Sequence, residues 1–384
     1  MVGGSQNLSE KEGKGYLNGK YSKDLRRAFW IVLCSGVMGL AARTPPANPV
    51  LSEAVREKIV RYIHQRFGVA DATKLSLGEA RDSFAPNFYE VSVITDDGKN
   101  KHDQPAWVSK DSRYLVLGNL FEVSEASNAE LVRRMRETFK VPDNVKLALG
   151  IFHASRVADF QTASLTIDNG KAPQERTVLL ARDGKHAVLG ELYSLDVDLQ
   201  KQALRTISLQ GAPTQGPANA PVTIVEYADL QCPMCARLHE FLETQVLPRY
   251  GNKVRVVFKE FPLVGIHDWS PLAAVACQCA YELNPSAYIP LRTAIFRNQG
   301  GINITNVREL LLNYGEQVGV DRVRLATCLD AKSSWPRVEQ DSAEGKRLNV
   351  VSTPTSFING RMIVGLPSFD AYYQVVDEAL KAGK

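Results

Sequence analysis

The sequence lacks a hydrophobic run long enough for an ordinary membrane-spanning helix. Its longest apolar stretch, AFWIVLCSGVMGLAA at 28–42, has 15 residues, whereas a helix needs about 20 to cross a bilayer. The stretch follows a basic segment and ends in small residues before Thr44-Pro45-Pro46, which is the order found in secretory signals. We therefore predict that residues 1–42 are a signal peptide or an N-terminal membrane anchor and that the chain is exported to the periplasm; a buried core helix is the alternative.

The chain also has little net charge and few cysteines. The formal charge is +4 over 384 residues, and residues 1–27 hold six basic against three acidic residues. The remainder is nearly balanced, so we expect no nucleic-acid partner. Outside the predicted signal five cysteines remain: Cys232, Cys235, Cys277, Cys279 and Cys328. No second CxxC or CxxH follows the first at zinc spacing, so we expect no metal site.

Residues 51–195 contain an internal repeat with a period of 72 residues. Without gaps, 19 of the 60 residue pairs that begin with Arg61 and Arg133 are identical. Each copy opens with a helical pattern, at 55–67 and 129–139, and then alternates apolar and polar residues as strands do. Neither copy has a nucleophile, a metal cluster or a phosphate-binding loop. We predict two small α+β units, residues 51–124 and 125–195, that serve as a binding or assembly platform.

The cysteine pair Cys232 and Cys235 stands at the start of a helical pattern that runs from Pro233 to Val246. A thiol at a helix N-terminus faces free N–H groups and the positive end of the helix dipole, which favour its thiolate. Pro233 suits the first turn because it has no N–H to lose. A second thiol one turn later can attack a mixed disulfide formed at the first. The pattern favours a redox-active pair over half of a zinc site or a structural disulfide.

Two other segments favour the same chemistry. Glu226 lies on a predicted strand six residues before Cys232, where a buried carboxylate can take the proton of Cys235; a merely structural glutamate is the alternative. Thr353-Pro354 precedes a predicted strand at 355–358. A proline there suggests a cis bond that exposes backbone to an extended substrate, with an ordinary trans proline as the alternative.

Residues from about 221 to 381 resemble the DsbA-like branch of the thioredoxin superfamily. The resemblance rests on VTIVEYADLQCPMC at 222–235, KEFPL at 259–263 and STPTSFINGR at 352–361. It implies an α/β thioredoxin-like domain at 204–384 with a helical insertion at about 269–345. The fold class expected for the whole chain is therefore α+β tandem repeats followed by this domain.

The resemblance also implies roles for individual residues. Cys232 would be the nucleophile, Cys235 the resolving thiol and Pro354 the cis-proline. Glu226, together with Lys259, would form a buried polar pair near the thiols. The residues expected to shape the site and contact substrate are Pro233, Met234, Thr353 and Lys259. No cofactor is expected beyond the Cys232–Cys235 disulfide itself.

The remaining cysteines and one histidine complete the expectations for this domain. The resemblance implies a structural disulfide between Cys279 and Cys328, closing a 49-residue loop that would contribute roughly 4 kcal/mol in the chain-entropy model. Cys277 is then a buried apolar residue, the true partner of Cys328 or a reactive thiol. His267 is a satisfied structural histidine or a neighbour of the site.

A second resemblance concerns the repeat units. Residues 177–185 and 190–193 are similar to the dimerisation domain of DsbC/DsbG-type disulfide isomerases, which carry one such domain where this chain has two units. The two units would either pair within the chain and mimic a dimer, or pair between chains and build a homo-oligomer.

Together these patterns predict a thiol–disulfide oxidoreductase whose partners are unfolded or misfolded exported proteins and a membrane or soluble redox protein. Met234 replaces the histidine that the strongest oxidases carry between their cysteines, so isomerase or reductase activity is favoured over oxidase activity. The alternatives are a DsbA-type dithiol oxidase and a holdase-type chaperone with incidental cysteines.

Overall fold

The computed structural model describes residues 51–69, 73–96, 98, 100–170 and 173–382. The predicted signal or anchor at 1–42 lies outside these residues. Among the described helices, none combines the length and the apolar character needed to cross a membrane.

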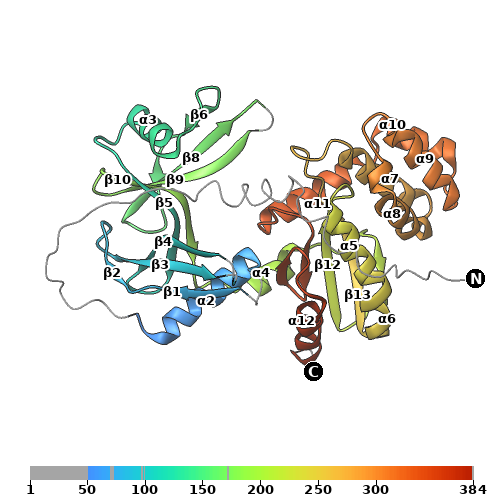
Figure 1. Ribbon diagram of the computed structural model, residues 1–384, viewed down its shortest axis with the longest axis horizontal. Coiled ribbons are helices and arrows are strands. Elements are labelled where there is room, and N and C mark those ends of the chain that lie inside the picture. Colours follow the sequence, from blue (N-terminus) through green and yellow to red (C-terminus); the bar gives the residue numbers. More distant parts are fainter. Residues whose placement is uncertain (1–50, 70–72, 97, 99, 171–172, 383–384) are drawn as a thin grey trace, which may run out of the picture.

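The N-terminal part is built on one antiparallel sheet of ten strands (Figure 1). Its order is β1-β3-β4-β5-β10-β9-β8-β6, with β2 beside β3 and β7 beside β8. The elements are α2 (Glu53–Phe67), β1 (Lys74–Leu77), β2 (Arg81–Asp82), β3 (Phe88–Asp96), β4 (Lys101–Ser109), β5 (Tyr114–Glu122), α3 (Asn128–Phe139), β6 (Lys146–Leu149), β7 (His153–Ala154), β8 (Phe160–Asp168), β9 (Gln174–Ala181) and β10 (His186–Ser194). A helix followed by five strands therefore occurs twice in the same order.

The two halves join where β5 pairs with β10 along its whole length. Gly118 lies opposite Gly190 at the centre of this register. A Cβ atom on Gly118 would lie 2.6 Å from the Gly190 Cα, so the two backbones approach too closely for any side chain at this point. The halves thus share one sheet within a single chain.

A shared core and a polar contact tie the halves together beside this strand pair. Phe88 and Phe160, which are 72 residues apart, pack edge to face with ring centroids 5.3 Å apart. Trp107 is fully buried in the same cluster. Nearby, the backbone N–H and the side-chain amide of Asn87 donate to the carboxylate of Asp159.

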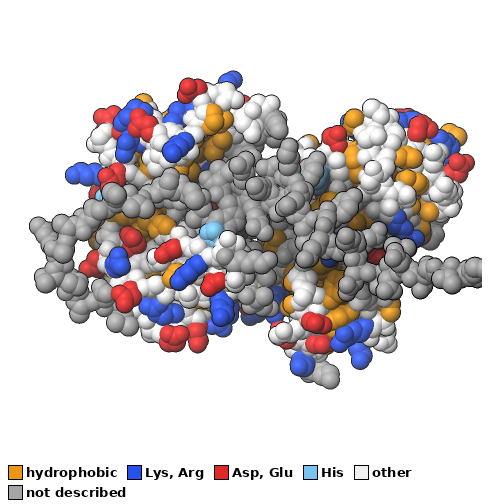
Figure 2. All heavy atoms as spheres, in the orientation of Figure 1, with side chains coloured by type: hydrophobic (Ala, Val, Ile, Leu, Met, Phe, Trp, Pro, Cys, Tyr) orange, Lys and Arg blue, Asp and Glu red, His pale blue; other side chains and the backbone are white. Residues whose placement is uncertain are grey.

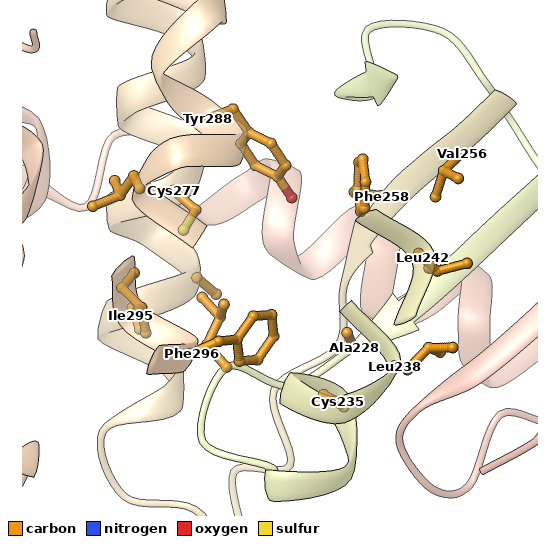
Figure 3. Packing of buried hydrophobic residues seen from close by; sticks show 14 of the residues in the cluster. Ala228, Cys235, Leu238, Leu242, Val256, Phe258, Cys277, Tyr288, Ile295 and Phe296 are labelled. Carbon is orange, nitrogen blue, oxygen red and sulfur yellow. The ribbon is translucent and has the colours of Figure 1, made fainter. Parts of the chain in front are cut away.

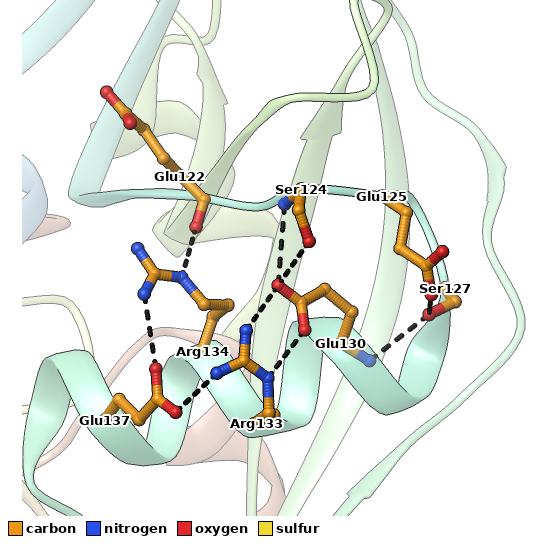
Figure 4. A network of polar contacts seen from close by, with 8 residues as sticks. All are labelled: Glu122, Ser124, Glu125, Ser127, Glu130, Arg133, Arg134 and Glu137. Carbon is orange, nitrogen blue, oxygen red and sulfur yellow. Dashed lines mark hydrogen bonds and ion pairs between the residues drawn. The ribbon is translucent and has the colours of Figure 1, made fainter.

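The second helix of this part, α3, starts where its sequence predicts. Ser127 precedes the helix, and its hydroxyl accepts a hydrogen bond from the backbone N–H of Glu130, which satisfies a donor of the first turn (Figure 4). Glu130 in turn accepts from Arg133 and from Ser124. These contacts lower the pKa of Glu130 to about 2.

The C-terminal part is built on a five-stranded sheet of order β11-β13-β12-β14-β15. The central strand β12 is parallel to β13 and antiparallel to β14, and nearly all of it is buried, as expected for a strand covered on both faces. The strands are β11 (Thr214–Gln215), β12 (Val222–Ala228), β13 (Val254–Glu260), β14 (Thr355–Ile358) and β15 (Arg361–Val364).

Helices cover this sheet and form an insertion between β13 and β14. The helices near the sheet are α4 (Leu199–Thr206), α5 (Pro233–Phe241), α6 (Leu247–Tyr250) and α12 (Phe369–Ala382), and the insertion consists of α7 (Ser270–Leu283), α8 (Tyr288–Arg297), α9 (Val307–Gln317), α10 (Arg322–Ala331) and α11 (Trp335–Arg347). Short 3₁₀ turns lie at Gly251–Lys253, Pro285–Ala287 and Gln299–Gly301, and a π turn at Leu242–Val246 separates α5 from α6. The sequence predicts a single helix from Pro233 to Val246. In the structure the α-helix α5 ends at Phe241, and the wider π turn follows it.

The two parts meet where α2 and α4 lie against the edge strand β15. The side chain of Asn349 donates to the carbonyl of Arg66, and the side chain of Gln200 donates to the carbonyl of Asn359. Because an edge strand presents unpaired backbone groups, this cover protects the sheet on that side. Figure 2 shows acidic and basic side chains interspersed over both parts in the view drawn.

Candidate functional site

The two cysteines lie where β12 ends and α5 begins. Cys232 is the residue that precedes the first helical turn of α5, with extended backbone angles, and Pro233 occupies the first helical position. Cys235 follows one turn later and is fully buried, whereas Cys232 is 6% exposed. Both are free thiols in this structure. Figure 3 shows Cys235 on its helix near Ala228 and Leu238.

The surroundings of the two thiols separate their affinities for protons. The hydrogen bond with Cys235, helped by the backbone N–H groups of Cys235 and Met234, lowers the pKa of Cys232 to about 6 although burial opposes ionisation. Burial, the neighbouring Cys232 sulfur and Glu226 together raise the pKa of Cys235 well above its usual value. Cys232 can therefore act as a thiolate near neutral pH while Cys235 keeps its proton.

A cis peptide bond between Thr353 and Pro354 lies against the reactive thiol, as the sequence predicts. The Cys232 Sγ lies 3.4 Å from the carbonyl oxygen of Thr353. Pro354 immediately precedes β14, so its loop presents backbone beside Cys232 at the end of the sheet. An extended peptide can pair with such a backbone while one of its sulfurs approaches Cys232.

Glu226 lies beneath the thiols, but its partner is not the predicted one. It is fully buried on β12 and pairs with Arg292 of α8, with Nη2 2.9 Å from Oε2. The second oxygen, Oε1, has no hydrogen-bond partner among the described residues. Burial raises the pKa of Glu226 although Arg292 opposes this. A carboxylate with a raised pKa and a free oxygen can accept a proton from Cys235.

The predicted pair between Glu226 and Lys259 is wrong, because the two side chains lie on opposite faces of the sheet. In the parallel register Glu226 is opposite Phe258, and Lys259 is opposite Tyr227. Neighbouring residues of a strand alternate between faces. The Lys259 Nζ instead lies 3.0 Å from Asp341 and 3.1 Å from Glu344, both on α11.

Arg292 connects the insertion to the sheet through a second carboxylate. Its Nη1 lies 3.5 Å from Glu260, which also accepts a 2.6 Å hydrogen bond from the hydroxyl of Tyr288. Burial raises the pKa of Glu260 to about 7. One guanidinium thus serves two buried carboxyl groups, so ionising both is costly and one retains a proton more readily. Arg292 could not be predicted from the sequence, because nothing in the spacing of residues on α8 relates it to β12.

The remaining predicted residues take the following positions. Met234 is partly buried and its sulfur lies 4.0 Å from the Arg237 guanidinium, while Pro233 is exposed beside the thiols. Cys279 and Cys328 form the disulfide that the resemblance implied, joining α7 to α10. Cys277 is a buried free thiol whose pKa burial raises well above its usual value, so its reactive and disulfide-bonded interpretations are both disfavoured. No group of three or more metal-ligating side chains occurs among the described residues.

Contacts of the turn around Cys232 with other loops include two residues that were not anticipated, Asp229 and Gln299. Asp229 is 1% exposed and accepts a 2.7 Å hydrogen bond from the backbone N–H of Leu263. For His267, one of the two interpretations placed it near the site. Its Nδ1 lies 2.8 Å from the Asp229 carboxylate. Gln299 of the insertion donates to the carbonyl of Cys232. These are contacts between loops, which local sequence patterns do not encode.

The fold of the sheet, the CxxC turn at a helix N-terminus and the adjacent cis-proline define a thioredoxin-like domain. Residues 208–378 match a family model described as Thioredoxin. This match covers the C-terminal half of the chain, so the class applies to that domain.

Proteins of known sequence extend this result to particular relatives. The chain is 25% identical over 176 residues to disulfide bond formation protein D of Bacillus subtilis, covering 45% of this chain and 79% of that protein. It is 30% identical over 170 residues to Na(+)/H(+) antiporter NhaA 3 of Salinispora tropica, covering 44% of this chain. The match spans only 25% of that protein's length. Among solved structures, oxidised BdbD from Bacillus subtilis is 25% identical, with a TM-score of 0.41 and coverage of 45% of this chain and 95% of that one.

Proposed function

We propose that this chain is a thiol–disulfide oxidoreductase that acts on unfolded or misfolded exported proteins. The observation that carries the proposal is the pair of thiols with divergent proton affinities, Cys232 lowered to a pKa of about 6 and Cys235 raised, beside the cis bond before Pro354. The similarity to disulfide bond formation protein D supports the same chemistry. The apolar segment at 28–42 supports export.

The chemistry begins with the thiolate of Cys232. It attacks one sulfur of a substrate disulfide, so a Cys232–substrate S–S bond forms while the substrate S–S bond breaks and its other sulfur leaves as a thiolate. In isomerisation a substrate thiolate then attacks the mixed disulfide and releases Cys232. In reduction, Cys235 passes its proton to Glu226 and attacks the Cys232 sulfur. The Cys232–Cys235 disulfide forms while the Cys232–substrate bond breaks and the second substrate sulfur leaves as a thiolate, so the substrate has gained two electrons.

The surface around the thiols supports a protein substrate. Val264 and Ile266, on the loop that contacts Asp229, are 65% and 62% exposed, and Val351, two residues before Thr353, is 54% exposed. Apolar side chains that remain exposed beside a reactive group favour the apolar segments that misfolded chains expose. We favour isomerase or reductase activity over oxidase activity because Met234 stands where the strongest oxidases carry a histidine, so the CxxC motif itself contributes no cation to the Cys232 thiolate.

We further propose that the two N-terminal halves are tandem copies of a DsbC/DsbG-type dimerisation unit that pair within one chain. The continuous β5–β10 ladder supports this arrangement. The resulting sheet would then take the place of the two-subunit platform on which such isomerases hold a client.

Recovery of activity from a scrambled-disulfide test protein tests the proposed function. We expect the wild-type chain to restore activity and Cys232→Ala to lose turnover, because the attacking sulfur is gone. Cys277→Ala, a matched removal of a buried thiol outside the pair, should retain activity. Activity on the fully reduced test protein alone would instead indicate an oxidase. A Cys232→Ala variant that still suppresses aggregation and loses nothing would overturn the proposal in favour of a holdase.

A further inference from the structure

Asp229 links the active-site turn to the loop that follows β13. Its carbonyl accepts a 3.1 Å hydrogen bond from the N–H of Cys232, and its own N–H donates to the Cys235 sulfur at 3.4 Å. The side chain is buried and faces away from solvent, with Oδ1 accepting from the N–H of Gln231 and Oδ2 from the N–H of Leu263. One residue therefore contacts the backbone of Cys232 and the sulfur of Cys235 through its own backbone, and it holds the neighbouring loop with its carboxylate.

His267 is the cationic side chain that this carboxylate meets. Its Nδ1 lies 2.8 Å from Oδ2 of Asp229 as an ion pair whose geometry is not that of a hydrogen bond, and the ring is only 17% exposed. The loop is fixed at a second point, because Gln231 donates to Asp268 and accepts from the N–H groups of Trp269 and Ser270. With the loop held at both points, the imidazole keeps its place beside the turn that carries Cys232.

The titratable groups that act most strongly on the His267 ring are acidic. Burial disfavours its charged form, but Asp229, the Cys232 sulfur and Asp268 favour it, and on balance the pKa of His267 is raised. Cys232 is itself a thiolate near neutral pH. The imidazolium and the thiolate thus favour each other's charged forms.

We propose that His267, held on Asp229, is a positioning residue that supplies from outside the CxxC motif the positive charge that Met234 does not provide between the thiols. The inference rests on the proposed function and extends it to the control of the reactive sulfur. The charge stabilises the dithiol form, in which Cys232 is anionic, and does nothing comparable for the disulfide, which carries no charge. His267 therefore makes the couple more oxidising while it is protonated, and this effect fades as the imidazole loses its proton.

The test is the rate at which iodoacetamide alkylates Cys232 between pH 4 and 9, measured on the reduced full chain, in which Cys235 is buried and has a raised pKa. Because only the thiolate reacts, the profile reports its population without any protein substrate. We expect His267→Gln to lower the rate about tenfold below pH 6, equivalent to one pKa unit, and the difference to vanish at high pH. His267→Lys should restore most of the rate, because lysine keeps a cation at this position.

The controls separate this inference from the proposed function. His153→Gln, the same exchange at an exposed histidine of the N-terminal sheet, should leave the profile unchanged. A wild-type profile with a midpoint near that of a free thiol would sink the proposed function. A low wild-type midpoint that His267→Gln leaves in place would overturn only the inference, and so would equal loss in the glutamine and lysine variants, since that result would mean a structural role.

Discussion

The two thiols of the CxxC turn differ because of what surrounds each sulfur. Cys232 lies at the N-terminus of helix α5, where backbone N–H groups donate hydrogen bonds toward its sulfur, and it is slightly exposed. Cys235 is enclosed by apolar residues, with the buried Glu226 among its neighbours. Fixed donors and desolvation thus act in opposite directions on two chemically identical groups.

This difference predicts a pH-dependent stability of the reduced form. The pKa of Cys232 falls from 9.0 to about 6 on folding. Between these values the unfolded chain binds more protons at this group than the folded chain, so the free energy of unfolding rises with pH. The slope should approach about 1.4 kcal/mol per pH unit between pH 6 and 9 and disappear as pH falls below 6. Above pH 9 the raised pKa of Cys235 makes the free energy of unfolding fall again.

Urea unfolding of the reduced and oxidised forms at several pH values checks this prediction. The oxidised form has no thiolate, so its stability serves as the reference that cancels the other titrating groups. Cys232→Ser, which can form neither the thiolate nor the disulfide, should lack the added pH dependence of the reduced wild-type chain, so the pH dependence of its stability should follow that of the oxidised form. A difference between the two forms that stays constant from pH 6 to 9 would contradict the lowered pKa.

Among the elements, β5 and β10 decide how the N-terminal part is assembled. Their register places Gly118 opposite Gly190, and the halves on either side contain the same order of elements. The two glycines permit a backbone approach that a residue with a Cβ atom would block. Two short glycine-containing segments, 72 residues apart, thus create one ten-stranded sheet.

We therefore expect Gly190→Val to lower the free energy of unfolding of the N-terminal part by roughly 1–3 kcal/mol or more, since overpacking usually costs this much. The added side chain would meet the backbone around Leu117 and Gly118. Limited proteolysis together with thermal unfolding measures the effect. Gly300→Ala is the control, because a Cβ there has no heavy atom within 4 Å. Equal stability of the two variants would mean that the β5–β10 pairing is absent in solution.

At the scale of the whole molecule, one thioredoxin-like domain is joined to the ten-stranded sheet that the two N-terminal halves form together. Helices α2 and α4 cover β15, and the hydrogen bond from the Asn349 side chain to the carbonyl of Arg66 crosses the junction. Asn87 of the first half and Asp159 of the second half occupy equivalent positions in the repeat, and they form a hydrogen bond. This contact favours pairing of a first half with a second half. Two copies of the second half would instead bring two buried Asp159 carboxylates together, which is unfavourable.

We expect the chain to be a monomer in solution, because the halves satisfy each other's pairing surface. Analytical ultracentrifugation over a wide range of concentrations measures the mass. Asp159→Leu removes the charge that disfavours pairing of two second halves, so it should increase self-association. Asp143→Asn, at an exposed position of the second half, is the surface control. A stable wild-type dimer at low concentration would favour pairing of the halves between chains.

Much of the thioredoxin-like domain can be predicted from local patterns. The strand that carries Glu226, the helix that starts after Cys232 and the proline at 354 each follow from residues close together in the chain. The strand β4 was not predicted, because its first half, from Lys101, alternates little and contains Pro105. Nearby residues decide helix starts, turns and strand periodicity, so these features are readable without a structure.

The sequence by itself determined the thiol pair, the cis-proline loop, the 72-residue period and the segments that become helices and strands. Only the tertiary structure decided that Glu226 pairs with Arg292, that Lys259 lies on the opposite face, that His267 meets Asp229 and that β5 pairs with β10. The physical reason is that each of these contacts joins residues distant in the chain, and its energy depends on packing and on desolvation in the folded state. Local periodicity carries no record of which distant side chain will share a buried site.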